Sequence, residues 1–284
     1  MAEPKVALVL GGGGIKPYSA VPLLKFLESN NIKLNLIAGC SGGSIMTALF
    51  ASGYSPDDIV RTVVPGLKKD LFKPNYRAFA SIVRLPYCKM DKESALIKPD
   101  ALRKKFREFF GNMRIEDLGM KIVLQATDFQ TGEGVGIETG DLADGVYASS
   151  AIYPMLPAIR IGERWLFDGV FSAPVPVLQA VRHRPDIIIA VDFLEKLSPD
   201  PRGYLETSIH TGKIYARTIA AAQTCLTLNL QDGEVIYIKM VFDKYISIWD
   251  IDKMPAILKA GEIALEKVKD EILSAYRHHQ QINK

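Results

Sequence analysis

Cysteine is scarce in this sequence: Cys40, Cys88 and Cys225 are the only three among 284 residues. An odd number of widely spaced cysteines argues against a disulfide framework and provides no CxxC pair for a metal site. The chain therefore fits a reducing compartment. We expect a cytoplasmic protein.

The sequence also lacks a strong excess of charge, since its formal net charge is only +3 at pH 7. Nucleic-acid-binding proteins usually present a pronounced basic face, so we expect no nucleic acid partner. One local excess exists in residues 68–92, where seven basic and two acidic side chains alternate with Phe72, Tyr76, Phe79 and Tyr87. Such a mixture suits peripheral contact with an anionic membrane surface. The open alternative is an ordinary solvated helical insertion.

Long uninterrupted apolar runs are missing as well. Residues 34–56 carry no charge, but repeated glycines and serines and Pro56 make them a poor membrane span. The first residues, MAEPKVALVLGGGG, contain an acidic residue and only a short apolar run, which does not match a secretory signal. No linker, low-complexity tract or internal repeat divides the chain, so we expect one domain over residues 1–284.

Two short apolar runs, residues 5–10 and 34–39, each end at glycines and lead into a segment with helical spacing. Repeated strand, turn and helix predict an α/β fold, with a mainly parallel central sheet and helices on its faces. We expect further strands at residues 121–127, 134–138, 158–161, 164–167, 186–192 and 235–241. Helices are expected at residues 17–29, 44–53, 174–183, 204–230 and 253–284, with a mainly helical insertion, a lid candidate, over 57–112.

The sequence Gly39-Cys40-Ser41-Gly42-Gly43 matches G-x-S-x-G and lies between a predicted strand and a predicted helix. Such an elbow strains the serine backbone and exposes its hydroxyl, while the flanking glycines allow close approach of neighbouring backbone. The N–H groups of the following helix can also stabilise an oxyanion. Ser41 is therefore a candidate nucleophile. The alternative is a turn that merely joins the strand to the helix.

The run Gly11-Gly12-Gly13-Gly14-Ile15-Lys16 fits neither the dinucleotide fingerprint nor the phosphate-binding loop, because no glycine stands at the required later position. Consecutive glycines do expose backbone N–H groups, which suits an oxyanion hole, and Lys16 offers a nearby positive charge. A flexible turn without chemistry stays open as the other interpretation.

Histidine is the other residue in short supply, and no histidine has the setting of a catalytic loop: His183 lies at the end of a predicted helix, His210 lies in another, and His278 and His279 lie in the polar tail. The serine needs a different base. Asp168 ends the apolar run WLF and precedes Gly169, at a strand end where sites assemble in α/β sheets. A carboxylate there must be partly desolvated to act as a base. An ordinary Asp-Gly turn is the alternative.

GGGGIK, GCSGG and an Asp-Gly pair 127 residues beyond the serine occur in this order. Together with the stretches IEDLGMKIVLQATDFQTGE and GDLADGVYASSAIYPMLPAIRIGERWLFDG, they resemble the patatin-like phospholipases over most of residues 5–192. The resemblance implies a three-layer α/β/α fold and a lipid acyl hydrolase without cofactors. Its substrates would be phospholipids, lysophospholipids or other fatty-acyl esters.

Carried over by position, the resemblance implies a dyad of Ser41 and Asp168. It assigns the oxyanion hole to a set of five residues, which are Gly12, Gly13, Gly14, Lys16 and Gly42. Two positions depart from the family pattern, namely Pro17, where glycine is usual, and Val170, where a small residue is usual. We expect both departures to change the shape of the pocket. An acyltransferase and a lipid-binding protein with a silent site remain alternatives.

Overall fold

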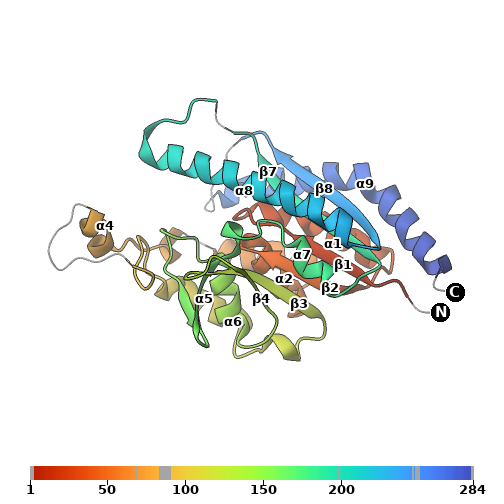
Figure 1. Ribbon diagram of the computed structural model, residues 1–284, viewed down its shortest axis with the longest axis horizontal. Helices are drawn as coiled ribbons and strands as arrows, with labels where there is room; N and C mark the ends of the chain where they lie inside the picture. Colours follow the sequence, from red (N-terminus) through yellow and green to blue (C-terminus); the bar gives the residue numbers. More distant parts are fainter. Residues whose placement is uncertain are drawn as a thin grey trace.

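The computed structural model describes residues 3–67, 69–82, 91–197, 199–244, 246 and 250–282 (Figure 1). In this part of the chain eight strands form one sheet: β1 (Val6–Leu10), β2 (Leu34–Cys40), β3 (Lys121–Asp128), β4 (Gly134–Ile137), β5 (Ile159–Ile161), β6 (Arg164–Asp168), β7 (Ile187–Glu195) and β8 (Glu234–Phe242). The α-helices are α1 (Val21–Ser29), α2 (Gly42–Ala51), α3 (Pro56–Asp58), α4 (Tyr76–Ile82), α5 (Asp100–Phe110), α6 (Leu142–Ser150), α7 (Val177–Val181), α8 (Gly203–Leu230) and α9 (Met254–Ile282). Short 3-10 or π turns are η1 (Lys16–Ala20), η2 (Ile59–Val63), η3 (Val64–Gly66), η4 (Lys69–Leu71), η5 (Ile115–Asp117), η6 (Gly169–Phe171) and η7 (Ile251–Lys253).

The sheet is mainly parallel, with the strand order β5-β6-β3-β2-β1-β7-β8 and β4 paired with β3. Strands β3, β2, β1, β7 and β8 run parallel. Strands β4 and β6 pair antiparallel with β3, and β5 pairs antiparallel with β6. The predicted α/β fold with a mainly parallel central sheet is confirmed.

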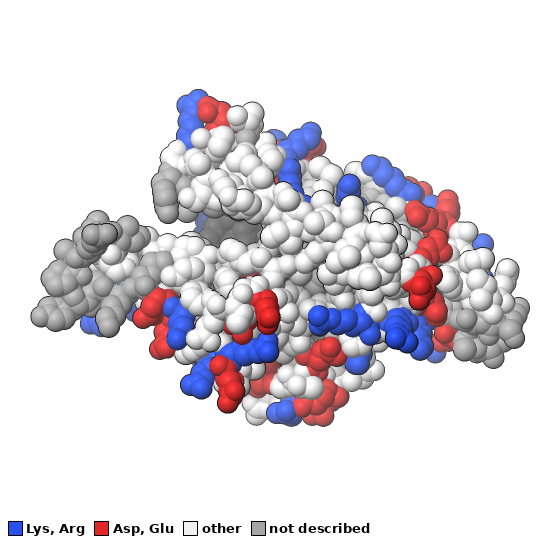
Figure 2. Space-filling view, in the orientation of Figure 1, with Lys and Arg blue, Asp and Glu red and all other residues white. Residues whose placement is uncertain are grey.

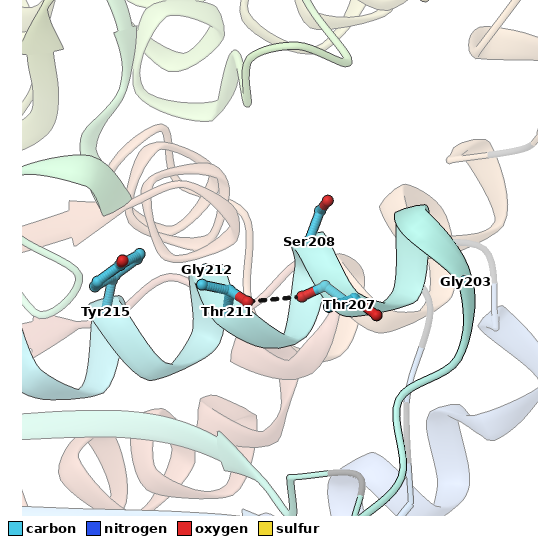
Figure 3. A pocket seen from close by; sticks show the side chains of 6 residues that line it. All are labelled: Gly203, Thr207, Ser208, Thr211, Gly212 and Tyr215. Atoms are coloured by element: carbon cyan, nitrogen blue, oxygen red, sulfur yellow. Dashed lines mark hydrogen bonds between the residues drawn. The ribbon is translucent and has the colours of Figure 1, made fainter.

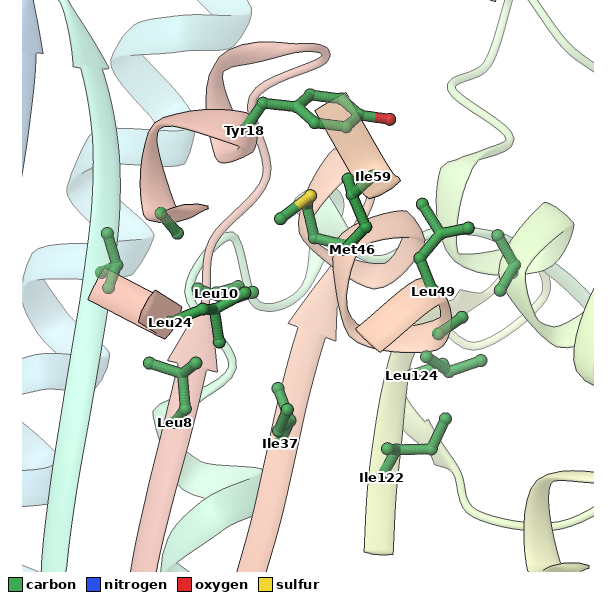
Figure 4. Packing of buried hydrophobic residues seen from close by; sticks show 14 of the residues in the cluster. Leu8, Leu10, Tyr18, Leu24, Ile37, Met46, Leu49, Ile59, Ile122 and Leu124 are labelled. Atoms are coloured by element: carbon green, nitrogen blue, oxygen red, sulfur yellow. The ribbon is translucent and has the colours of Figure 1, made fainter. Parts of the chain in front are cut away.

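Helices cover both faces of the sheet, which explains why the central strands are continuously apolar. On β1, Ala7 and Val9 belong to an apolar cluster with residues of α7 and α8. Leu8 and Leu10 belong to the larger cluster on the opposite face, with residues of α1, α2, α6 and α9. Figure 4 shows Met46 and Leu49 of α2 in this larger core, together with the strand residues Leu8, Leu10 and Ile37.

The described part of residues 57–112 is mainly helical, as expected, but several of its turns are of the 3-10 or π type. Among their described residues only α4 and α5 form α-helices of seven residues or more. Part of the remainder is extended: the Asn75 N–H donates to the Leu96 carbonyl, the Lys98 N–H donates to the Lys73 carbonyl, and Pro74 pairs with Ile97. Proline favours such extended pairing over helix, because it lacks an N–H and its ring restricts the preceding residue.

The C-terminal helix α9 lies on the larger core, as its apolar stripe predicts. Gly261 and Ile272 are buried, and Leu258, Leu265 and Val268 pack against the same cluster. Gly261 allows the closest contact, since a Cβ placed there would lie 1.9 Å from the Ser19 carbonyl oxygen. No helix in the described ranges, α8 and α9 included, combines the length and the apolar content needed to cross a membrane.

Strands from the first residues to Phe242 share one sheet, and α9 packs on the core that α1 and α2 also use. A single domain over residues 1–284 stays a prediction, and these contacts of the described residues agree with it. In the view of Figure 2, charged side chains are sparse over the C-terminal half of α8, where the sequence has none from Thr218 to Leu230.

Candidate active site

Ser41 forms a strained turn between β2 and α2, as the G-x-S-x-G pattern predicts. Its φ of 52° and ψ of −123° lie in a region that residues other than glycine rarely adopt, and such a conformation costs about 1–3 kcal/mol. Surrounding backbone leaves no room for a side chain at the neighbouring glycines: a Cβ on Gly39 would lie 2.6 Å from the Gly43 carbonyl oxygen. On Gly43 it would lie 2.3 Å from the Leu10 carbonyl oxygen.

Asp168 lies at the end of β6, and the register of the sheet brings it beside Ser41. Cys40 is paired with Gln125 on β3, and the next β3 residue, Ala126, is paired with Asp168. The Ser41 hydroxyl donates to the Asp168 carboxylate, with 2.7 Å between Oγ and Oδ2. Two side chains 127 positions apart in the chain are therefore in direct hydrogen-bonding contact.

The Asp168 carboxylate is fully buried and has few polar partners. Burial raises the pKa of Asp168 to about 7, although the Val170 N–H and the Ser41 hydroxyl both donate to the carboxylate and lower its pKa. The Cys40 thiol lies 4.0 Å from Oδ1, and burial together with the Asp168 charge raises the pKa of that thiol. A pKa near neutrality suits a carboxylate that must take a proton from a serine hydroxyl.

Backbone contacts from β3 and α6 hold both residues in place. The Ser41 N–H donates to Ser149, to its carbonyl at 3.1 Å and its Oγ at 3.2 Å. The Asp168 N–H donates to the Ala151 carbonyl, and the Thr127 hydroxyl donates to the Asp168 carbonyl. Sequence reasoning missed this support. Helix α6 was not expected from the sequence, and the one visible signal of this support was the run of small residues from Ala148 to Ala151.

The glycine run lies against the serine turn. A Cβ on Gly12 would lie 3.5 Å from the Ser41 Cβ, and one on Gly42 would lie 1.9 Å from the Gly14 carbonyl oxygen. The Gly12 N–H, however, donates to the Pro174 carbonyl at 2.8 Å and is not free to bind an oxyanion. The expected set of donors is corrected accordingly. Among the described residues the N–H groups of Gly13, Gly14 and Gly42 have no acceptor.

Lys16 also differs from the expectation. Its ammonium pairs with Glu195, with 2.6 Å between Nζ and Oε1, and both side chains are buried. This carboxylate offsets the positive charge that the sequence analysis assigned to the oxyanion hole, so that part of the prediction is corrected. Sequence reasoning missed Glu195 because the predicted strand ended at residue 192, whereas β7 continues through Glu195.

No histidine contacts the pair of Ser41 and Asp168, and all four histidines lie in the described ranges. His183 lies 3.4 Å from Glu138, and His279 lies 3.9 Å from Glu234. His210 is part of α8, and His278 is part of α9. The expectation that the serine has a carboxylate and not a histidine as its partner agrees with this geometry.

Among the described residues, neither Ser41 nor Asp168 lines the two hollows considered next. The described lining of one, of about 630 Å³, comes from α8, and Figure 3 shows Ser208 and Tyr215 projecting from the same side of that helix. The other, of about 410 Å³, is lined by Asp91, Lys92, Glu93, Phe129 and Tyr153. Within the described ranges no three His, Cys, Asp or Glu side chains are grouped as metal ligands.

The basic segment 68–92 is only partly described. Lys68, Arg84, Tyr87 and Lys89 fall outside the described residues. On α4, Tyr76 and Phe79 are 78% and 46% exposed, so two of the aromatic side chains considered for membrane contact face solvent.

Comparison with known families settles what kind of protein carries this site. A family model described as patatin-like phospholipase matches residues 8–181, which include the glycine run, the serine turn and the Asp-Gly pair. The chain belongs to this family. The matched range ends before β7 and therefore does not include Glu195.

Individual relatives of this patatin-like protein are distant. It is 27% identical over 207 residues to "Lysophospholipase NTE1" of Debaryomyces hansenii. The aligned residues make up 73% of this chain and 13% of that protein. It is 24% identical over 199 residues to an uncharacterized NTE family protein of Mycobacterium tuberculosis, covering 68% of this chain and 50% of that one. The chain thus spans half or less of the length of these relatives.

Among solved structures, VipD from Legionella pneumophila is similar in fold. The TM-score is 0.57 at 14% sequence identity, covering 95% of this chain and 67% of that one. At this identity the similarity concerns the fold alone. It agrees with the mainly parallel sheet and its helical layers.

Proposed function

We propose that this patatin-like protein is a serine hydrolase for fatty-acyl esters of lipids, with Ser41 as nucleophile and Asp168 as general base. The observation that carries the proposal is the 2.7 Å hydrogen bond from the Ser41 hydroxyl to a fully buried carboxylate. Family membership and the resemblance to lysophospholipases support the lipid ester as substrate. Phospholipids and lysophospholipids are the substrate classes that we propose.

In the first step Asp168 takes the proton of Ser41 while the serine oxygen attacks the ester carbonyl carbon. The negative charge that develops on the carbonyl oxygen would be stabilised by the free N–H groups of Gly13 and Gly14, and by that of Gly42 at the start of α2. Collapse of this intermediate breaks the bond to the alcohol, which leaves with the proton from Asp168. Water then attacks the acyl-serine, and Asp168 again takes and returns a proton.

The strained backbone of Ser41 has a chemical use in this proposal. With φ at 52° the serine is held at the point where β2 ends and α2 begins. The helix N-terminus then lies beside the nucleophile, where its partial positive charge favours an anion. Because these groups are already in place, little reorganisation is needed when charge develops.

Peripheral membrane contact through residues 68–92 is part of the proposal. Tyr76 and Phe79 are exposed on α4, and Lys69, Lys73 and Arg77 lie beside them in the sequence. Aromatic side chains that enter the headgroup region, together with basic side chains that attract anionic lipid, make such contacts favourable. A cytoplasmic location stays a prediction from the scarcity of cysteine.

Turnover by the purified chain and by two single variants tests the proposal. Ser41→Ala removes the nucleophile, and Asp168→Asn keeps the shape but removes the base. We expect both to lose about 10³-fold or more of the activity toward aryl esters and phospholipids. Wild-type turnover in Ser41→Ala would rule out the assignment. Product formed only with an alcohol or thiol acceptor would instead make the protein an acyltransferase, and lipid binding without turnover would make the site silent.

A further inference from the structure

The glycine run is held from one side by alternate residues of β7. The Gly11 N–H donates to the Val191 carbonyl at 2.9 Å. Two residues further along, a Cβ on Gly13 would lie 3.2 Å from the Phe193 Cβ and 3.2 Å from the Lys16 Cε. Gly13 is thus enclosed between β7 and the Lys16 side chain.

Two residues beyond Phe193, Glu195 binds the ammonium of that same lysine. The distance from Lys16 Nζ to Glu195 Oε1 is 2.6 Å, and the glutamate side chain is 2% exposed. The Lys16 N–H in turn donates to the Gly13 carbonyl at 3.1 Å. Lys16 therefore closes the turn that contains Gly13 and Gly14, and its side chain is tied to the end of β7.

Glu195 is itself held by several donors. Lys213 of α8 donates to Oε2, and the Ile246 N–H donates to Oε1 at 3.1 Å. Arg217 of α8 donates to the Glu195 carbonyl. Burial alone would raise the pKa of Glu195, but the charges and hydrogen bonds of Lys16 and Lys213 outweigh burial and lower it.

We propose that Glu195 is a positioning residue: through Lys16 it holds the N–H groups of Gly13 and Gly14 in the orientation that stabilises an oxyanion at Ser41. This inference rests on the proposed function for its chemical meaning, but its structural part does not require turnover. The matched family range ends before Glu195, so the family comparison does not assign it a role. Because Lys213 and Arg217 donate to Glu195, α8 also helps to hold Glu195 in place.

The glycine run needs this support because nothing in its own backbone restrains its conformation. Glycine has the greatest backbone freedom of any residue, so four in a row cost conformational entropy unless neighbouring groups restrain them. A buried ion pair with complete hydrogen bonding restrains geometry well, and removing one partner leaves the other uncompensated. An oxyanion donor also acts only when it is close to its proper position.

Hydrogen exchange and steady-state kinetics on the full chain test the proposal together. Glu195→Gln keeps the volume and removes the charge, and Lys16→Met removes the other partner. Asp192→Asn is the matched control, since Asp192 is a carboxylate on the same strand whose side chain accepts from Tyr237 at 3.0 Å and, among the described residues, makes no hydrogen bond to the glycine run. Both test variants should speed amide exchange across residues 11–20, and the control should not.

In kinetics, Glu195→Gln and Lys16→Met should lower kcat about tenfold or more and change KM little, because ground-state binding does not use the oxyanion donors. The double variant should lose about as much as the worse single variant, since both act through one contact. Unchanged exchange in Glu195→Gln, or the same change in Asp192→Asn, would overturn the proposal. Faster exchange in a protein without turnover would uphold the positioning role and reject the proposed function instead.

Discussion

The backbone of Gly42 lies directly against that of Gly14. A Cβ on Gly42 would be 1.9 Å from the Gly14 carbonyl oxygen and 3.1 Å from its nitrogen. The start of α2 and the glycine run therefore approach each other so closely that no side chain fits at Gly42. Both segments carry N–H groups that we propose for the oxyanion hole, so in this proposal their spacing sets the geometry of that hole.

Replacement of Gly42 by alanine tests this contact. The added methyl group must push the glycine run away from Ser41, because no flexible side chain can yield. We expect the free energy of unfolding to fall by about 1–3 kcal/mol, as in other overpacked sites, and kcat to fall by about 10²-fold. Gly119→Ala is the control, since nothing lies within 4 Å of a Cβ there. Denaturant titration measures the free energy of unfolding, and ester turnover measures kcat. If Gly42→Ala has the same values as Gly119→Ala, the close contact between Gly42 and Gly14 does not matter for stability or turnover, contrary to the proposal.

The pH dependence of turnover follows from the burial of Asp168. Only the ionised carboxylate can accept the Ser41 proton, so kcat/KM should rise with pH and level off above a midpoint of about 7. A solvated aspartate, with a pKa near 3.9, would give a flat profile over the same range. Initial rates with an uncharged aryl ester between about pH 5 and 9 measure the midpoint. A profile without a rise between these limits would show that Asp168 is not the base.

Stability should show the same ionisation without any substrate. The pKa of Asp168 is raised to about 7 in the folded state, so ionisation of its carboxylate destabilises the folded protein relative to the unfolded chain. This destabilisation is absent below the unfolded pKa near 4, grows as the pH rises, and is complete above about 7. Asp168→Asn has no ionisable group at this position and is therefore not destabilised in this way. Relative to the wild type, the free energy of unfolding of Asp168→Asn should increase by about 1 kcal/mol for each pH unit between about pH 4 and 7.

Denaturant titrations of both proteins at several pH values give this difference, in which effects independent of pH cancel. A difference that stays constant from about pH 4 to 8 would mean that Asp168 titrates normally.

Membrane contact through α4 predicts a loss of lipid binding when its exposed aromatic side chains are removed. Tyr76 and Phe79 are exposed, so replacing both by serine should leave the stability within about 0.5 kcal/mol of the wild type. Flotation with liposomes that contain anionic lipid should show less bound protein, and binding should also weaken with salt. Ile263→Ser on α9, where the side chain is 51% exposed, is the control. Lipid binding that is unaffected both by the Tyr76 and Phe79 substitutions and by salt would contradict membrane contact through α4.

Local patterns predicted most of the fold. The central strands are apolar on both faces and end at glycines or acidic residues, so β1, β2, β3 and β7 were expected near their observed positions. Helix α9 was expected from its apolar stripe. The strained Ser41 and the crowded Gly39 and Gly43 also agree with what the spacing of the motif requires.

Tertiary contacts account for what the sequence could not predict. No local pattern shows that the Gly12 N–H donates to the Pro174 carbonyl, or that Lys16 pairs with a carboxylate 179 residues away. In residues 57–112 the extended pairing between residues 73–75 and 96–98, which interrupts the helical segments, was also not expected. The end of β7 was missed because Asp192 resembles a strand terminus, whereas β8 pairs with β7 as far as Glu195.

Covalent labelling of the purified chain with a fluorophosphonate, followed by peptide mass spectrometry, is the decisive test of Ser41 as nucleophile and Asp168 as its base. We expect one adduct on Ser41 in the wild type. We also expect labelling at least about tenfold slower in Asp168→Asn, because the hydroxyl then has no base, and no adduct in Ser41→Ala. A folded wild-type protein that stays unlabelled, or one that is labelled equally fast in Asp168→Asn, would contradict this assignment.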